Sequence, residues 1–304
     1  MIGYCCINQT LRKTHTVNRT MRKKTFQEKG LQYVGELVYS NVSDLIEILK
    51  WNVENGILLY RMSSDMFPWM TEYQIQQLPN FNDIKNKLEQ AGNYIKENKM
   101  RVSFHPGPFN VLGSQKENVV RKTIIELVRH SQIMDLMGLD QNTYYPINIH
   151  VACTKPSKEI IAENFCRNFE LLEEGTQKRL VVENDDKESQ YGPLELFDLI
   201  YEKIAIPLTF DQFHFTCSNK QYSEQQQLKE ALELSLLTWE TKPLTHHSSS
   251  KRLESGDEKI KETAHSDYIL DRIIDFGYDF DTELEAKAKE LAVLDYFQKF
   301  QESI

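Results

Sequence analysis

The sequence predicts a (β/α)₈ barrel, a fold of the α/β class, on three observations. Eight short apolar runs alternate with amphipathic stretches along the 304 residues. Polar side chains of the kinds used in catalysis follow the ends of these runs, where a barrel carries its active site. No GxGxxG turn follows the first run, although the competing doubly wound open sheet usually has one.

The predicted strands are short apolar runs bounded by polar or turn residues. They cover residues 2–7, 56–62, 100–104, 145–151, 179–183, 206–210, 242–247 and 279–285. The fifth is the clearest example. Its Leu180, Val181 and Val182 form a run of the kind that fills a strand buried on both faces.

The predicted helices lie between and after these strands. They cover residues 43–53, 82–97, 117–137, 158–174, 194–203, 224–237, 267–275 and 286–301. The third shows the pattern best, because most of its apolar residues fall on one broad face: Ile124, Ile125, Leu127, Val128, Ile133, Met134 and Met137.

We expect one domain, residues 1–304, with a basic arm at 9–27 and a polar loop at 248–264 as insertions. No apolar run is long enough to cross a bilayer, so we expect no membrane partner. The five cysteines are odd in number and lack zinc-ligand spacing, which favours reduced thiols in a cytoplasmic or nuclear compartment. We also expect a monomer.

Charge is unevenly distributed along the chain. The net charge is −9, yet residues 1–27 contain no acid and six bases: Arg12, Lys13, Arg19, Arg22, Lys23 and Lys24. A basic arm on an acidic body can contact nucleic-acid phosphates locally. A solvated surface loop is the alternative interpretation of this stretch.

The fifth strand is followed by Glu183, Asn184, Asp185 and Asp186, which end the apolar run and on their own are also typical of a solvated acidic loop. Crowded carboxylates repel one another, so a cation or strong donors should offset them. Other strand ends carry similar groups. The full set is His105, His150, Glu183, Asp211, His214, His246, His247, His265 and Glu285, which includes six of the eight histidines.

This mixed set of imidazoles and carboxylates favours a site for several manganese, zinc or iron ions over a merely polar barrel mouth. Clustered metals favour hydrolysis of a phosphodiester. Isomerisation or epimerisation of a sugar is the competing chemistry on such a barrel. The basic arm and the aromatic residues Tyr4, Trp69, Phe109 and Tyr145, which can stack on bases, favour a nucleic-acid substrate.

The order of several motifs resembles that of the ultraviolet-damage endonuclease family. The motifs are Ile2-Gly3-Tyr4 with Asn8, Asn18-Arg19-Thr20-Met21-Arg22, Tyr60-Arg61-Met62-Ser63-Ser64-Asp65, Ser103-Phe104-His105-Pro106-Gly107, Glu183-Asn184-Asp185-Asp186, Asp211 with His214, His265-Ser266-Asp267-Tyr268-Ile269 and Glu285-Ala286-Lys287. The resemblance implies a TIM barrel with two or three divalent ions, Mn²⁺ first and Zn²⁺, Co²⁺ or Mg²⁺ as alternatives. It also implies nicking of double-stranded DNA 5′ to cyclobutane pyrimidine dimers and 6-4 photoproducts.

Carried over residue by residue, the resemblance implies the metal ligands His105, His150, Glu183, Asp211, His214, His247, His265 and Glu285. Of these, Glu183, Asp211 and Glu285 would be catalytic. Tyr4 and Asn8 would line the lesion pocket, and Arg19 and Arg22 belong to the DNA-binding arm. Pro108 and Phe109 match a pair that enters the duplex beside an extruded lesion.

Three departures from the family pattern are expected to affect activity. Pro108 stands where the family usually has Gln, and Thr245 where a lysine precedes the strand-seven histidine by two residues. A histidine after the Ser-Ser motif is missing, and Phe67-Pro68-Trp69-Met70-Thr71 is found there instead, so water or His246 would complete the metal centre. A catalytically weakened lesion-binding protein is therefore a third hypothesis.

Overall fold

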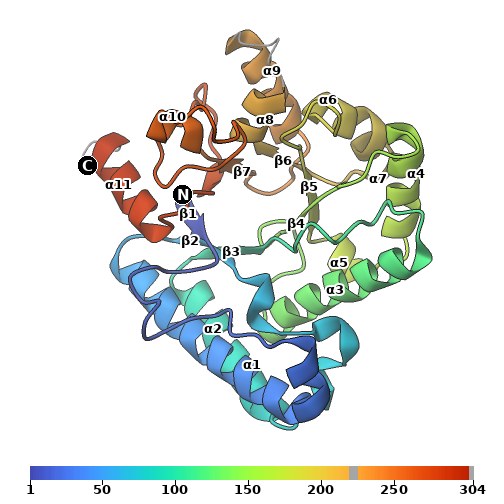
Figure 1. The fold of residues 1–304 in the computed structure, drawn as a ribbon, viewed down its shortest axis with the longest axis vertical. Helices are drawn as coiled ribbons and strands as arrows, with labels where there is room; N and C mark the ends of the chain where they lie inside the picture. Colours follow the sequence, from blue (N-terminus) through green and yellow to red (C-terminus); the bar gives the residue numbers. More distant parts are fainter. Residues whose placement is uncertain (219–224, 301–304) are drawn as a thin grey trace.

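A computed structural model describes residues 1–218 and 225–300 of the chain. Eight parallel strands form a closed barrel in the order β1 to β8, with β1 also paired to β8 (Figure 1). They are β1 (Ile2–Cys5), β2 (Leu59–Met62), β3 (Arg101–Phe104), β4 (Ile147–His150), β5 (Leu180–Glu183), β6 (Leu208–Asp211), β7 (Leu244–His247) and β8 (Asp281–Leu284). The predicted fold class and all eight predicted strands are confirmed.

Helices surround the strands in the view down the molecule (Figure 1). The longer ones are α1 (Lys23–Glu54), α2 (Phe81–Glu97), α3 (Glu117–Leu136), α4 (Lys158–Phe169), α9 (Gln225–Leu236) and α11 (Glu290–Phe300). Shorter segments are η1 (Ser64–Met66), η2 (Met70–Glu72), η3 (Ile75–Gln77), α5 (Glu174–Gln177), α6 (Pro193–Leu196), η4 (Phe197–Tyr201), α7 (Glu202–Ile204), α8 (Gln212–Ser218) and α10 (Lys251–Ser255). Within the described ranges no helix is both long and apolar enough to span a membrane.

The first helix is longer than the sequence indicated. The predicted helix begins at residue 43, whereas α1 begins at Lys23. Residues 23–27 of the basic arm are therefore helical. The two parts of α1 meet at Gly30, whose φ of 59° is a left-handed conformation that glycine adopts without strain. Polar residues on the exposed face of the first part hid its helical periodicity.

The predicted helix at 267–275 is wrong. The segment is irregular because its backbone groups bond to side chains elsewhere: Leu270 N–H donates to Ser249 Oγ, and Ile273 N–H donates to the Tyr296 hydroxyl. The helix in this crossover is the short α10, inside the stretch predicted as a polar loop. Residue 224, the first of the predicted helix 224–237, and residue 301, the last of the predicted helix 286–301, lie outside the described residues.

A buried arginine closes the amino-terminal end of the barrel. Arg101 on β3 is fully buried, and its Nη1 lies 3.0 Å from Asp281 Oδ2 on β8. The same guanidinium donates to the carbonyls of Tyr144, Pro243 and Thr143. One side chain thus ties four separate parts of the chain together beneath the site described below.

Replacing Arg101 by Met should lower the free energy of unfolding by about 3 kcal/mol, the lower end for a broken buried pair, because Asp281 keeps Lys242 and the N-terminal amine as partners. Urea denaturation followed by circular dichroism measures the change. The matched control is Lys50→Met, which breaks an exposed pair with Glu47 and should cost less than about 0.5 kcal/mol. Equal losses in the two variants would contradict the bracing role of Arg101.

Candidate metal centre

The carboxyl ends of the strands gather imidazoles and carboxylates from six different strands or the loops that follow them. Among the described residues, three groups place their ligand atoms within 4.8 Å of one another. They are His105 with Glu183, His246 and Glu285; His150 with Glu183 and His214; and His214 with His265 and Glu285. Glu183, His214 and Glu285 each belong to two groups, so the three groups form one continuous cluster.

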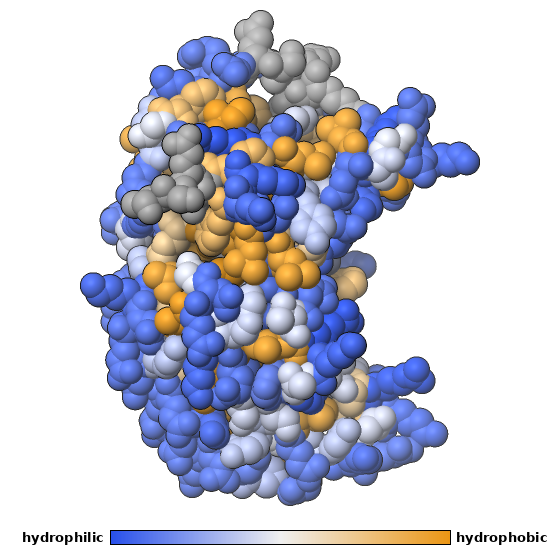
Figure 2. All heavy atoms as spheres, turned by 90° about the vertical axis from the view of Figure 1, so that its left-hand side faces the viewer, coloured by the Kyte–Doolittle hydropathy of each residue, from blue (hydrophilic) through white to orange (hydrophobic). Residues whose placement is uncertain are grey.

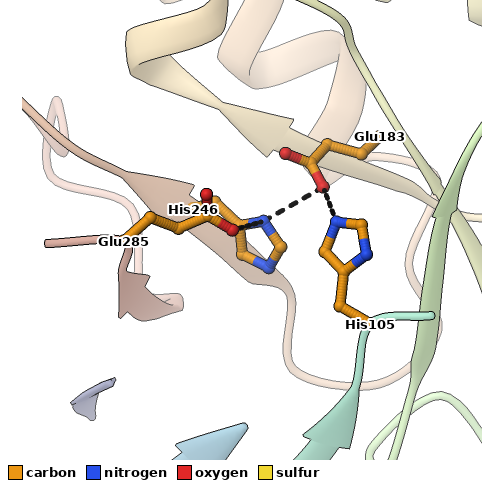
Figure 3. A group of neighbouring side chains, drawn as sticks. All are labelled: His105, Glu183, His246 and Glu285. Atoms are coloured by element: carbon orange, nitrogen blue, oxygen red, sulfur yellow. Dashed lines mark hydrogen bonds and ion pairs between the residues drawn. The ribbon is translucent and has the colours of Figure 1, made fainter. Parts of the chain in front are cut away.

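The first group surrounds Glu183, which is fully buried at the end of β5 (Figure 3). Glu183 Oε2 lies 3.0 Å from His105 Nε2 and 3.1 Å from His246 Nδ1. Glu285 enters from the opposite side, and its Oε1 lies 3.6 Å from His246 Nδ1. Two carboxylates and two imidazoles therefore face one small space.

The other two groups extend the cluster along the barrel mouth. Glu183 Oε1 lies 3.2 Å from His214 Nδ1, and Glu183 Oε2 lies 3.6 Å from His150 Nε2. His265 Nδ1 lies 3.7 Å from Glu285 Oε2, and the rings of His265 and His214 have centroids 5.9 Å apart. Glu183 Oε1 faces the second group and Oε2 contacts members of both the first and the second, so this carboxylate would be shared if each group held an ion.

Asp211 lies beside the cluster rather than within one of its groups. It is fully buried, and its Oδ1 accepts a hydrogen bond of 2.7 Å from the backbone N–H of His214. Its Oδ2 lies 3.6 Å from His214 Nδ1. Asn184 exchanges two hydrogen bonds with the backbone of Asp211 and so joins the ends of β5 and β6. Burial raises the pKa of Asp211.

The charges of the cluster are strongly coupled. Burial raises the pKa of Glu183, but His246 and His150 outweigh it and hold that pKa well below its usual value. Burial lowers the pKa of His246 and of His214, but neighbouring carboxylates outweigh it and raise both pKa values well above the usual one. His246 and His214 therefore favour the protonated form, and a bound cation would displace those protons.

These residues fit divalent ions on structural grounds. Within the described part of the chain, Glu183 Oε1 and Asp211 Oδ2 are buried without a hydrogen-bond partner, and such atoms normally have one. Both lie among nitrogen and oxygen donors of the type that bind manganese, zinc or iron. The cluster offers enough shared carboxylates for more than one ion.

His247, predicted as a ligand, belongs to none of the three groups found among the described residues, whereas its neighbour His246 lies in the first of them. Successive side chains of a strand point to opposite faces, and on β7 it is His246 that points into the barrel. His247 is 7% exposed and faces outward, onto a cavity of about 910 Å³ beside α8 and α10. Burial lowers the pKa of His247 to about 4. The residue two positions before the inward histidine is therefore Leu244 rather than Thr245.

Several residues of the site were missed by the sequence analysis. Arg61 at the end of β2 forms an ion pair with Glu285, and Asn148 on β4 donates to Glu183. Glu283, two residues before Glu285, faces the same interior space. Asp185 Oδ1 lies 3.2 Å from His150 Nδ1. Asn148 and Glu283 could have been found from strand alternation, because they lie two residues before His150 and Glu285 and so face the same side of the strand.

The structure places Tyr4 and Asn8, predicted to line the lesion pocket, in a buried hydrogen-bond network. Tyr4 is 0% exposed and donates to Asn52 Oδ1 on α1, which excludes stacking of its ring on a base. The amide of Asn8 donates to the Tyr4 hydroxyl, and Asn8 Oδ1 accepts from Leu11 N–H. These bonds fix the start of the basic arm.

The arm itself contains both internal and exposed bases. Arg19 Nη2 lies 2.6 Å from Asp44 Oδ2, so this guanidinium braces the arm against α1. Arg22 is exposed at the start of α1. Trp69, expected to stack on bases, stacks instead on Phe26 with ring centroids 5.6 Å apart, and its indole N–H donates to Met21 O. Tyr145 is buried.

The loop after β3 carries an exposed aromatic ring above His105. Phe109 is 89% exposed, and Pro108 beside it is also exposed. The base of the loop is fixed, because Asn110 is buried and its amide donates to Gly107 O and to Glu126 Oε1. In profile the molecule is hollowed along one edge (Figure 2).

The chain is a (β/α)₈ barrel with a cluster of imidazoles and carboxylates at the carboxyl ends of its strands, which is where enzymes of this fold carry their active sites. The whole chain, residues 1–304, matches the family model described as UV-endonuclease UvdE. The chain therefore belongs to the UV-endonuclease family.

Individual relatives agree with this membership. The chain is 31% identical to the UV DNA damage endonuclease of Clostridium perfringens over 99% of its own length and 71% of that protein. It is also 31% identical to a putative UV-damage endonuclease of Acanthamoeba polyphaga mimivirus, over 98% and 91% of the two chains. The crystal structure of SacUVDE superposes with a TM-score of 0.84 at 29% identity, covering 99% of both chains.

Replacing Glu183 by Gln keeps the size of the side chain and removes the charge shared by two groups. We expect loss of at least one bound ion after saturation with Mn²⁺ and dialysis, measured by inductively coupled plasma mass spectrometry. Glu188→Gln, at an exposed carboxylate on the loop after β5, should retain the wild-type content. Full metal content in folded Glu183→Gln would remove Glu183 from the centre of the site.

Proposed function

We propose that this protein is a metal-dependent DNA repair endonuclease that nicks double-stranded DNA 5′ to ultraviolet photoproducts, both cyclobutane pyrimidine dimers and 6-4 photoproducts. The observation that carries the proposal is the set of three overlapping ligand groups at the mouth of a barrel of the UV-endonuclease family. Family membership favours this chemistry over sugar isomerisation or epimerisation, the competing use of such a barrel.

The ligands of this proposal are His105, His150, Glu183, His214, His246, His265 and Glu285, with Asp211 as a further carboxylate next to His214. They suit two or three ions, Mn²⁺ first. When bound, such ions lower the pKa of water and stabilise the charge that develops on phosphate oxygens. Glu183 and Glu285 hold the groups together: Glu285 has one oxygen near each of two groups, and Glu183 contacts members of two groups.

DNA would contact the mouth through the exposed arm and the loop after β3. Arg12 and Arg22 are exposed, so they are free to meet phosphates, whereas Arg19 holds the arm in position through Asp44. Phe109 is the aromatic residue placed to enter the duplex, and Pro108 stiffens the loop beside it. An extruded lesion leaves a gap in the stack that an aromatic ring fills.

The test is a duplex carrying one cyclobutane dimer, incubated with the protein and Mn²⁺ and resolved on a denaturing gel. We expect a nick immediately 5′ of the dimer, none in the undamaged duplex, and none after addition of a chelator. A second duplex with a 6-4 photoproduct defines the lesion range. Binding of damaged DNA with no nick under Mn²⁺, Zn²⁺, Co²⁺ or Mg²⁺ would instead indicate a lesion-binding protein.

Replacing Phe109 by Ala should weaken binding to dimer-containing duplex by roughly 10- to 100-fold, since stacking contributes on the order of 1–3 kcal/mol per base. Binding to undamaged duplex should change little, because it has no gap to fill. Dissociation constants on both duplexes at one salt concentration measure the difference.

The matched control for this variant is Leu171→Ala, which shortens an exposed apolar side chain between α4 and α5, away from the strand ends. It should leave both constants unchanged. Equal losses on damaged and undamaged duplex in Phe109→Ala would show that the ring covers the barrel mouth instead of entering the DNA.

A further inference from the structure

A further buried carboxylate, Glu283, lies inside the barrel next to the metal centre. It is fully buried on β8, two residues before Glu285, and the strand register pairs it with His246 on β7. Glu283 Oε2 lies 3.2 Å from His246 Nε2. Glu283 belongs to none of the three ligand groups found among the described residues.

Two other strands hold Glu283 in this position. The Ser103 hydroxyl on β3 donates to Glu283 Oε1. The guanidinium of Arg61 on β2 lies 3.8 Å from Glu283 Oε2 and also pairs with Glu285. A carboxylate fixed by a hydroxyl and a guanidinium in a packed interior has little freedom to move toward the metal-binding space.

The imidazole of His246 is therefore placed between two carboxylates on opposite sides. Its Nδ1 lies 3.1 Å from Glu183 Oε2 on the side of the metal centre, and its Nε2 faces Glu283. Both are ion-pair contacts rather than aligned hydrogen bonds. A histidine that binds a metal through one nitrogen commonly presents the other N–H to a carboxylate, which fixes the tautomer and the ring orientation.

We propose that Glu283 is a positioning residue of the metal centre. It holds the Nε2–H of His246 and so directs the Nδ1 lone pair into the space between Glu183 and Glu285. The proposal rests on the proposed function, because it assumes that the first ligand group binds an ion. Glu283 acts through His246 and is not itself a ligand, since the imidazole separates its carboxylate from Glu183.

The test measures Mn²⁺ affinity by titration of the metal-free full-length chain. Glu283→Ala should weaken binding by about 10- to 100-fold, the range found when a partner of a ligating histidine is lost. Glu283→Gln, whose amide oxygen still accepts from Nε2–H, should lose less. Thr245→Val is the matched control: it removes a buried hydroxyl that contacts Thr282 on the same two strands and should keep wild-type affinity.

The second readout is the tautomer of the neutral His246 imidazole in metal-free protein, followed above its raised pKa by nitrogen NMR with ¹⁵N-histidine and assigned by the signal missing from His246→Asn. We expect a proton on Nε2 in the wild type and a shift toward a tautomer mixture in Glu283→Ala. A merely structural role for Glu283 would lower stability without changing this signal.

The outcomes separate the two proposals. A wild-type chain that binds no Mn²⁺ would overturn the metal centre of the proposed function. Tight binding by the wild type with equal affinity and an unchanged tautomer in Glu283→Ala would overturn only the role of Glu283. If Glu283→Ala does not fold, Glu283→Leu decides, because it keeps the bulk and removes the acceptor: weakened Mn²⁺ binding supports the role, and wild-type affinity overturns it.

Discussion

The dominant physical constraint on this structure is the burial of carboxylates at the barrel mouth. Glu183, Asp211 and Glu283 are fully buried, and Glu285 lies beside them, within reach of a single guanidinium from Arg61. Removing such charges from water costs several kcal/mol each unless partners replace the lost hydration. Arg61 supplies compensating charge, as do His246 and His214, whose pKa values the carboxylates raise well above the usual one. Divalent ions would supply it more directly, and the chain positions its ligands accordingly.

Buried carboxylates follow the eighth strand from the amino end of the barrel to its carboxyl end. Asp281, Glu283 and Glu285 alternate on the inward face, with Arg101 opposite the first and Arg61 beside the other two. At the amino end the Asp281 carboxylate is paired with Arg101, Lys242 and the N-terminal amine, whereas at the carboxyl end the carboxylates lie among imidazoles. One strand thus separates the part of the barrel that maintains the fold from the part that can bind cations.

Much of this arrangement could be predicted from the sequence. The eight strands could be predicted because buried parallel strands are short apolar runs that end abruptly, as the fifth does between Val182 and Glu183. Two neighbouring histidines could not be told apart, because the inward face of β7 depends on the register with β6 and β8 rather than on the local sequence. The burial of Tyr4 was also missed, since it depends on Asn52, which is 48 residues away on α1. The irregular segment at 267–275 depends on side chains of Ser249 and Tyr296.

The loop after β3 combines an exposed tip with a fixed base. Buried Asn110 bonds to Gly107 and to Glu126, and Val111 N–H donates to the hydroxyl of Thr123 on α3. When a flexible loop becomes ordered on binding a partner, the loss of conformational entropy reduces the affinity. Here the backbone beneath Phe109 is ordered before any encounter, so most of the rearrangement falls on the DNA. The rate of association should therefore follow how readily a given duplex opens, and weakly stacked sites would be engaged sooner than intact ones.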